Sequence, residues 1–219
     1  MISLLLPTRG RPGELAASVA GLIELADRPD QVQVCYAIDP DDPGTADTVQ
    51  ALRRPLDHVL TATERHGYAG LHRYVNASAR CATGEWFMVW NDDATLLTPG
   101  WDSLVREHDG RDVVLDPRTD HDNTMPLFPV IPARYVRALG HLSLSPHCDS
   151  WWDDISNWLG ILRPVDVLIS HTPSGGRDDR TALESRAGAR SAEFFGPELT
   201  AARQHDAAVI RDMIRGAQA

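Results

Sequence analysis

The chain has 219 residues, enough to bury one continuous core without disulfides or structural metals, and its 42% apolar and 24% charged residues are typical of a soluble globular protein. A net charge of -10 argues against a protein that mainly coats nucleic acid, because such proteins need Lys and Arg to neutralise phosphates. A local basic groove is still compatible with that charge. No apolar run is long enough to span a bilayer, so we expect no membrane span.

Cysteine and arginine usage bear on the compartment and the source. Three widely spaced cysteines, Cys35, Cys81 and Cys148, fit reduced thiols better than a disulfide framework or a zinc site. Met1 leads directly into a strand-like run, without the regions of a signal peptide, so we expect a cytoplasmic protein. All 21 basic residues are arginines, which indicates a GC-rich genome, although arginine also suits bidentate phosphate contacts.

The first half of the chain alternates strand-like and helical patterns. Short continuous apolar runs predict strands buried on both faces, and apolar residues at helical spacing lie between them. The expected strands are Ile2–Leu6, Gln31–Ile38, Asp57–Ala62 and Glu85–Trp90, and the expected helices are Leu15–Leu25, Thr45–Arg53 and Ala69–Ala79. This alternation predicts an α/β fold with a mostly parallel central sheet flanked by helices.

The pattern loosens in the second half. We expect helices at Trp101–Glu107, Asp149–Leu159 and Pro197–Arg215, and strands at Val113–Leu115 and Val165–Ser170. The polar, proline-bearing stretch Asp116–Pro132 is expected to be irregular and to form one wall of a binding site. The Gly-rich stretch 174–179 is expected to be a mobile loop.

An acidic turn, Asn91-Asp92-Asp93, directly follows the fourth expected strand. Open α/β sheets place their ligands at the carboxyl ends of their strands. Divalent cations with oxygen ligands need carboxylates on a rigid support, so Asp93 is the first candidate metal ligand. The alternative is a plain turn or helix cap, because acidic pairs after a strand are common.

Two further strand ends are expected at the same edge of the sheet. The loop Pro7–Pro12 offers backbone amides, a hydroxyl and two guanidinium groups to a nucleotide, or is simply the loop and N-cap before the first helix. Asp39 ends the second expected strand and could accept hydrogen bonds from a base or a ribose. Asp41 and Asp42 are expected to serve a proline-rich turn.

The third cluster lies on the helix expected from Asp149. Asp149 and Asp153 share one helical face, four residues apart, and both are candidate catalytic carboxylates, with Asp149 the expected base. A solvated face is the alternative for Asp153 and for Asp154. Trp151 and Trp152 are expected to form part of the core or a platform on which a sugar stacks.

His171 ends the last expected strand. A lone histidine is usually structural, but this strand end is expected to return to the acidic edge, and imidazole is an ordinary ligand for manganese-type ions. His171 is therefore the second candidate metal ligand.

The order and spacing of these motifs resemble glycosyltransferase family 2 and its GT-A relatives over Ile2–His171. Leu6–Arg11 resembles the opening strand and nucleotide loop of the family, and Ala37–Asp39 resembles its second strand with a base-binding aspartate. The helix leading into the family's metal motif is represented by Gly70, Arg73 and Asn76, followed by Ala82, Gly84 and Glu85.

The resemblance implies a role for each cluster. Asn91-Asp92-Asp93 stands where the family carries Asp-x-Asp, so Asp93 takes the metal role, while Asn91 departs from the pattern and contacts the ribose or nothing. His171 matches a late metal ligand, and the Gly-rich loop after it resembles a flexible lid over the diphosphate. The nucleotide-binding candidates are Pro7, Thr8, Arg9, Arg11, Asp39, Tyr68, Gly70, Arg73, Asn91 and Asp92.

Cys148-Asp149 replaces the family's Glu-Asp pair and keeps the aspartate assigned as general base. The resemblance thus implies one GT-A domain, with a nucleotide-binding half (1–93), an acceptor-side half (94–171), a flexible loop (172–196) and a C-terminal helix (197–219). The implied activity is that of a metal-dependent, inverting, hexosyltransferase-like enzyme using Mn²⁺ or Mg²⁺ and, as the expected donor, a UDP-sugar.

The resemblance leaves the acceptor open among a protein, a glycan, a small molecule and modified phage DNA, and it leaves homodimer formation open. One alternative is a non-catalytic nucleotide- or glycan-binding module, in which Asn91 and Cys148 are signs of decay. The other is a sugar nucleotidyltransferase, which the absence of lysine disfavours, because the opening loop of such enzymes carries one.

Overall fold

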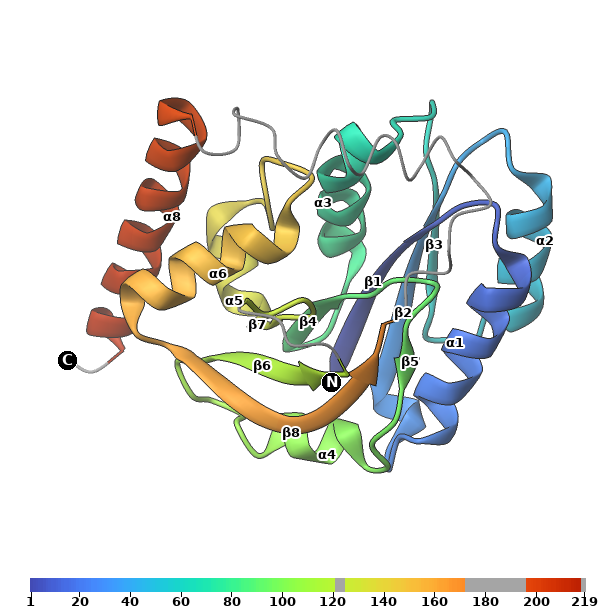
Figure 1. Ribbon diagram of the computed structural model, residues 1–219, viewed down its shortest axis with the longest axis horizontal. Helices are drawn as coiled ribbons and strands as arrows, with labels where there is room; N and C mark the ends of the chain where they lie inside the picture. Colours follow the sequence, from blue (N-terminus) through green and yellow to red (C-terminus); the bar gives the residue numbers. More distant parts are fainter. Residues whose placement is uncertain (121–124, 172–195, 218–219) are drawn as a thin grey trace.

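Eight strands form one curled sheet with helices on both faces within residues 1–120, 125–171 and 196–217, which the computed structural model describes (Figure 1). The strand order is β3-β2-β1-β4-β7-β6-β8-β5. The expected α/β architecture is therefore confirmed. The flexible loop expected at 172–196 lies, except for Gly196, outside the described residues.

The first half of the chain builds the parallel part of the sheet. Its strands are β1 (Ile2–Thr8), β2 (Val32–Ile38), β3 (His58–Thr61) and β4 (Trp86–Val89). Its helices are α1 (Pro12–Glu24), α2 (Pro43–Leu52) and α3 (Leu71–Cys81), with 3-10 turns η1 (Pro29–Gln31) and η2 (Tyr68–Gly70). All pairings among these four strands are parallel, so their carboxyl ends lie at one edge.

The second half adds mixed pairings. Its strands are β5 (Thr95–Leu96), β6 (Val114–Thr119), β7 (Val130–Pro132) and β8 (Leu162–Ser170). Its helices are α4 (Trp101–Arg106), α5 (Ala133–Leu139), α6 (Cys148–Leu159) and α8 (Pro197–Gly216). β7 runs antiparallel to β4 and to β6, β6 runs parallel to β8, and β5 runs antiparallel to β8.

The expectation of an irregular segment from Asp116 to Pro132 is wrong at both ends. β6 continues to Thr119, and β7 covers the last three residues of the segment. Prolines argue against strands because they cannot donate to the ladder, but Pro117 lies where the register between β6 and β8 shifts. The sheet accommodates this proline at an irregularity. The short β5 and α5 were not expected either, because elements of 2 and 7 residues are too short to show a clear hydrophobic period.

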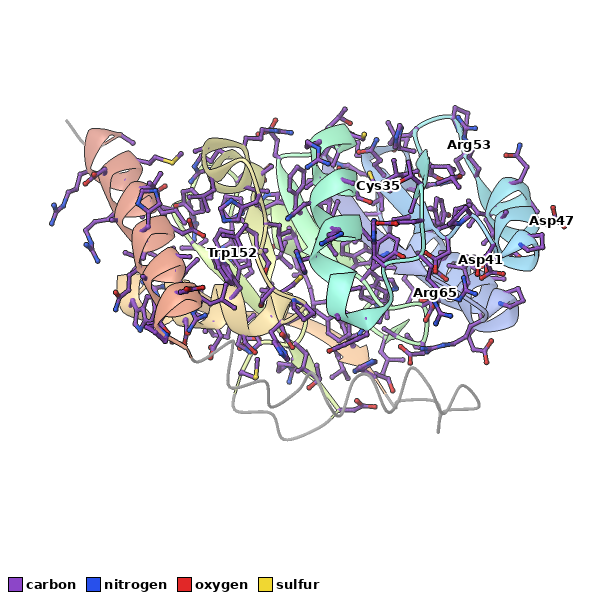
Figure 2. All side chains as sticks on the ribbon, turned by 90° about the horizontal axis from the view of Figure 1, so that it is seen from above. Cys35, Asp41, Asp47, Arg53, Arg65 and Trp152 are labelled. Carbon is purple, nitrogen blue, oxygen red and sulfur yellow. The ribbon has the colours of Figure 1, made fainter. Side chains whose placement is uncertain are left out.

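Each face of the sheet has its own apolar core. Leu4 and Leu6 of β1 pack with residues of α1, α2 and α4, whereas Leu5 between them packs with residues of α3. Trp152 lies on the second face, between α8 and α3 (Figure 2). Trp151 and Trp152 are both completely buried, so of their two expected roles the structure supports the core.

Helix α8 packs against α6 and α5 and lies at one end of the molecule (Figure 1). Asp206 of α8 is 2% exposed and accepts hydrogen bonds from Trp151 Nε1 and His141 Nε2, each at 3.0 Å. Arg203 pairs with Asp154 at 2.8 Å, and the Asp154 side chain remains 34% exposed. α6 is thereby held by buried polar contacts as well as by apolar packing. Among the described residues, no helix combines the length and apolarity needed to cross a membrane.

Gly84, in the turn between α3 and β4, provides a test of this packing. A Cβ at that position would meet both the backbone nitrogen and Oγ of Ser3 at 2.7 Å, so Gly84→Ala should lower the free energy of unfolding by about 1–3 kcal/mol. Gly21→Ala is the matched control, because no atom lies within 4 Å of its added Cβ, and it should be neutral or stabilising by about 0.5–1 kcal/mol. Urea denaturation measures both, and equal effects would contradict the close approach.

Candidate functional site

The acidic turn, Asn91-Asp92-Asp93, follows β4 and is held in place by hydrogen bonds to α1. Trp90, which precedes the turn, and Ala94, which follows it, are both fully buried. Ser18 of α1 accepts a hydrogen bond from Trp90 Nε1 at 2.8 Å and donates one to the carbonyl oxygen of Ala94 at 2.6 Å. A single buried hydroxyl thus ties both ends of the turn. Sequence reasoning missed Ser18, and the only available signal was a small polar residue on an apolar helix face.

The pairing of β5 with β8 brings His171 to the acidic turn. Thr95 pairs with Ser170, so the residues just before β5 and just after β8 become neighbours. His171 Nε2 lies 3.3 Å from Asp93 Oδ1 and 3.2 Å from Asn91 Nδ2. The structure therefore brings together the two residues expected to be metal ligands.

Arg11 and Thr8 join the β1–α1 loop to the same turn. Arg11 Nη1 lies 2.6 Å from Asp93 Oδ2 and 3.3 Å from Asp92 Oδ1. Thr8 Oγ1 donates to the other oxygen of Asp92 at 2.7 Å. Burial raises the pKa of Asp92 in spite of the nearby guanidinium. Burial also acts to raise the pKa of Asp93, but its contacts with His171 and Arg11 lower it below the usual value.

A second polar cluster surrounds Asp39 at the end of β2. Asp39 is 6% exposed and accepts hydrogen bonds from Tyr74 Oη and, at 3.0 Å, from Arg9 Nη1. Burial, assisted by this hydrogen bond to the carboxylate, raises the pKa of Tyr74 to about 12. A carboxylate has about four lone-pair sites, so Asp39 keeps acceptor capacity for a ligand.

Asp41 and Asp42 have different roles. Asp42 caps α2 and accepts a hydrogen bond from Thr45 N at 3.2 Å, as expected for a turn residue. Asp41 instead pairs with both terminal nitrogens of Arg9, at 2.5 and 3.1 Å. The hydrogen bonding to Arg9, assisted by the charges of Arg9 and of the nearby Arg65, lowers the pKa of Asp41 (Figure 2). Arg9 is therefore fixed between Asp39 and Asp41.

The other nucleotide-binding candidates lie outside these two clusters. Pro7 is half-buried within β1, and Tyr68 is half-buried in η2. Gly70 is buried, and a Cβ there would meet His66 Cβ at 2.5 Å, so packing accounts for this glycine. Arg73 is exposed on α3 and forms no polar contact with the acidic turn.

Three carboxylates gather between α6 and β6. Asp149, in the first turn of α6, accepts hydrogen bonds from the adjacent Ser150, its only such partner within the described residues, and burial raises its pKa. Burial also raises the pKa of Asp153, one turn later, with added repulsion from Asp154 and Asp149. Asp116 on β6 has a pKa raised by burial and by the charge of Asp153. Sequence reasoning missed Asp116 because it assigned this residue to an irregular segment.

Helix α3 connects the Asp39 cluster to α6. Tyr74 of α3 binds Asp39, and two residues later Asn76 binds the segment that leads into α6. Asn76 Oδ1 accepts from Leu142 N at 2.7 Å, and Asn76 Nδ2 donates to the Ser143 carbonyl at 2.8 Å. One helix thus sets the position of both groups of polar residues.

Solved structures share this fold. They include segment 1–349 of S. aureus TarS, with a TM-score of 0.62 and 13% identity over 78% of this chain and 60% of that chain. The same segment in complex with UDP-GlcNAc has a TM-score of 0.60 and 13% identity over 79% and 59% of the two chains. The present chain therefore spans about 60% of that TarS segment.

A third similar structure is the mannosyltransferase PcManGT from Pyrobaculum calidifontis, in complex with GDP-Man and Mn²⁺. It has a TM-score of 0.65 and 14% identity over 99% of this chain and 74% of that chain. Identities this low show the fold alone. No curated protein matches the sequence. Residues 3–141, more than half of the chain, match the family described as Glycosyl transferase family 2, and the chain belongs to this family.

Proposed function

We propose that this chain is a metal-dependent, inverting glycosyltransferase that moves a sugar from a nucleoside diphosphate to an acceptor hydroxyl. The observation that carries the proposal is the convergence of Asp93, His171 and Arg11 at the carboxyl edge of the sheet. A departing diphosphate needs positive charge and hydrogen-bond donors at such a place. Membership of the family and the fold shared with PcManGT give further support.

Asp93 and His171 fit a divalent cation. Adjacent ligands of an octahedral ion, each about 2.1 Å from the metal, lie about 3 Å apart, and Asp93 Oδ1 and His171 Nε2 are separated by 3.3 Å. No third His, Cys, Asp or Glu completes such a set in the part of the chain that the structure describes. Asp93 and His171 are the residues that would hold the ion. A cation bound there offsets the charge that develops on the leaving group.

The chain's own residues perform the remaining steps. Asp39 accepts a hydrogen bond from the nucleobase, and Arg9 keeps that carboxylate in place. Asp149 takes the proton from the acceptor hydroxyl while the oxygen of that hydroxyl attacks the anomeric carbon. The diphosphate leaves from the opposite side of that carbon. A carboxylate whose pKa is raised by burial is a better proton acceptor than an exposed one, which supports Asp149 as the base.

The donor in this proposal is a nucleoside diphosphate sugar, with a UDP-sugar expected first. TarS structures contain UDP or UDP-GlcNAc and PcManGT contains GDP-Man, so both bases belong in the test. A transfer assay with UDP-, GDP- and TDP-sugars would identify the donor. Turnover without an added acceptor, measured as hydrolysis, would also separate an enzyme from a non-catalytic binding module, whereas binding without release of any nucleotide would favour the module.

Removing the proposed metal ligand should uncouple nucleotide binding from metal. Asp93→Asn should weaken Mn²⁺-dependent binding of UDP or GDP at least about 100-fold, because it removes a charged ligand rather than a supporting contact. Isothermal titration calorimetry with Mn²⁺ and with EDTA measures the effect. Asp166→Asn is the control, since Asp166 is 80% exposed and pairs with Arg118, away from the acidic turn. Equal affinities for Asp93→Asn and the control would remove Asp93 from the metal role.

Asp149→Asn should separate catalysis from binding. We expect kcat to fall about 10²- to 10⁴-fold, with the Kd for the donor unchanged, because general-base assistance has this magnitude. Asp153→Asn is the comparison, since Asp153 lies one turn away on the same helix and has a partner in Asn157. Wild-type turnover in Asp149→Asn, or an equal loss in Asp153→Asn, would move the base role away from Asp149.

The same substitution should stabilise the protein in a defined pH range. Burial raises the folded-state pKa of Asp149 above the usual 3.8, so the folded state becomes less stable as the pH rises through that raised pKa. Asp149→Asn removes this cost, so its Tm should exceed that of the wild type near pH 8, and the difference should vanish below about pH 4. Thermal unfolding at the two pH values measures this. A difference that is the same at both would rule out an ionisation effect.

A further inference from the structure

We propose that Arg11 makes the metal ion and the donor bind as a pair. In the free protein its guanidinium offsets part of the negative charge of the acidic turn and weakens metal binding, and a bound diphosphate reverses this effect. The inference rests on the proposed function, because it concerns the same Asp93–His171 pair. It goes further by stating how affinity for the ion depends on the donor.

Arg11 and the proposed ion would share one carboxylate. Arg11 Nη1 contacts Asp93 Oδ2 at 2.6 Å, while the other oxygen of Asp93 faces His171 Nε2 at 3.3 Å. The same nitrogen lies 3.3 Å from Asp92 Oδ1. The side chains of Asp92 and Asp93 are only 8% and 13% exposed, so water screens these charges weakly. The guanidinium therefore acts on the metal position at short range.

The formal charges show why the order of binding matters. Asp92, Asp93 and Arg11 together carry one negative charge, so adding a divalent cation leaves the site with one positive charge. A nucleoside diphosphate sugar carries two negative charges and returns the sum to one negative charge. Half-buried charges within a few ångströms interact by several times the thermal energy, so this change in sign should alter metal affinity by at least about tenfold.

Arg11 also keeps donors for the diphosphate. Its Nη2 and Nε have no hydrogen-bond partner among the described residues, and its side chain is 32% exposed. Arg9, from the same loop, differs because both of its terminal nitrogens are held by Asp39 and Asp41. Arg11 is therefore the arginine of this loop that can bind phosphate oxygens without giving up Asp93.

The test measures the affinity of the protein for Mn²⁺, first alone and then with UDP or GDP present. The electron paramagnetic resonance signal of unbound Mn²⁺ reports the free ion. Titrations without protein correct for the Mn²⁺ that the nucleotide itself binds. Arg11→Met should bind Mn²⁺ alone at least about tenfold more tightly than the wild type, because it removes the opposing charge. Nucleotide tightens Mn²⁺ binding by some factor in the wild type, and in Arg11→Met this factor should be at least about tenfold smaller. Because the coupling is reciprocal, the factor by which Mn²⁺ tightens nucleotide binding should fall by the same amount.

Two variants act as controls. Arg11→Lys keeps the charge, so its affinity for Mn²⁺ alone should remain near that of the wild type. Arg118→Met removes an exposed arginine that pairs with Asp166, and it should change neither measurement. Equal or weaker binding of Mn²⁺ alone by Arg11→Met would overturn the proposal, since weaker binding would mean that Arg11 only orients Asp93.

The two proposals fail differently. If the proposed function is wrong, neither UDP nor GDP tightens Mn²⁺ binding by the wild type, and no donor is turned over. The comparison of Mn²⁺ alone still decides the role of Arg11 in that case. If only the role of Arg11 is wrong, nucleotide tightens Mn²⁺ binding to the same extent in the wild type and in Arg11→Met.

Discussion

The antiparallel pairing of β5 with β8 is the contact on which the candidate site depends. β5 is only Thr95–Leu96, yet it begins one residue after the acidic turn, and its partner Ser170 directly precedes His171. The acidic turn and the histidine are far apart in the sequence, and this ladder brings them together in space. The Ser18 clamp on Trp90 and Ala94 holds the other side of the same turn. The site therefore depends on two short contacts to rigid elements rather than on a long loop.

Helices α3 and α6 extend this arrangement across the molecule. α3 binds Asp39 through Tyr74 and the segment before α6 through Asn76, so a shift of that helix would move both polar clusters together. α6 in turn is fixed to α8 through Asp206 and Arg203, on the side away from Asp149. Buried hydrogen bonds of this kind are costly when broken, which favours a single arrangement of these helices.

Charge is distributed unevenly over the candidate site. At the carboxyl ends of β1, β2 and β4 the arginines and carboxylates are matched, because Arg9 pairs with Asp39 and Asp41 and Arg11 pairs with the acidic turn. Around α6 the carboxylates repel one another, and burial raises their pKa values. This difference fits a proposed division of labour in which one side holds a charged donor and the other takes up a proton.

The sequence by itself determined the α/β class, the alternating first half and the presence of Asp93 at a strand end. These features are local, since apolar periodicity and an adjacent acidic turn are readable from neighbouring residues. Only the tertiary structure decided that β6 extends to Thr119, that β7 is a strand, that Asp41 binds Arg9, and that Trp151 and Trp152 lie in the core. It also decided that His171 meets Asp93, because pairings between residues far apart in the chain depend on the register of whole strands, which no short stretch of sequence specifies.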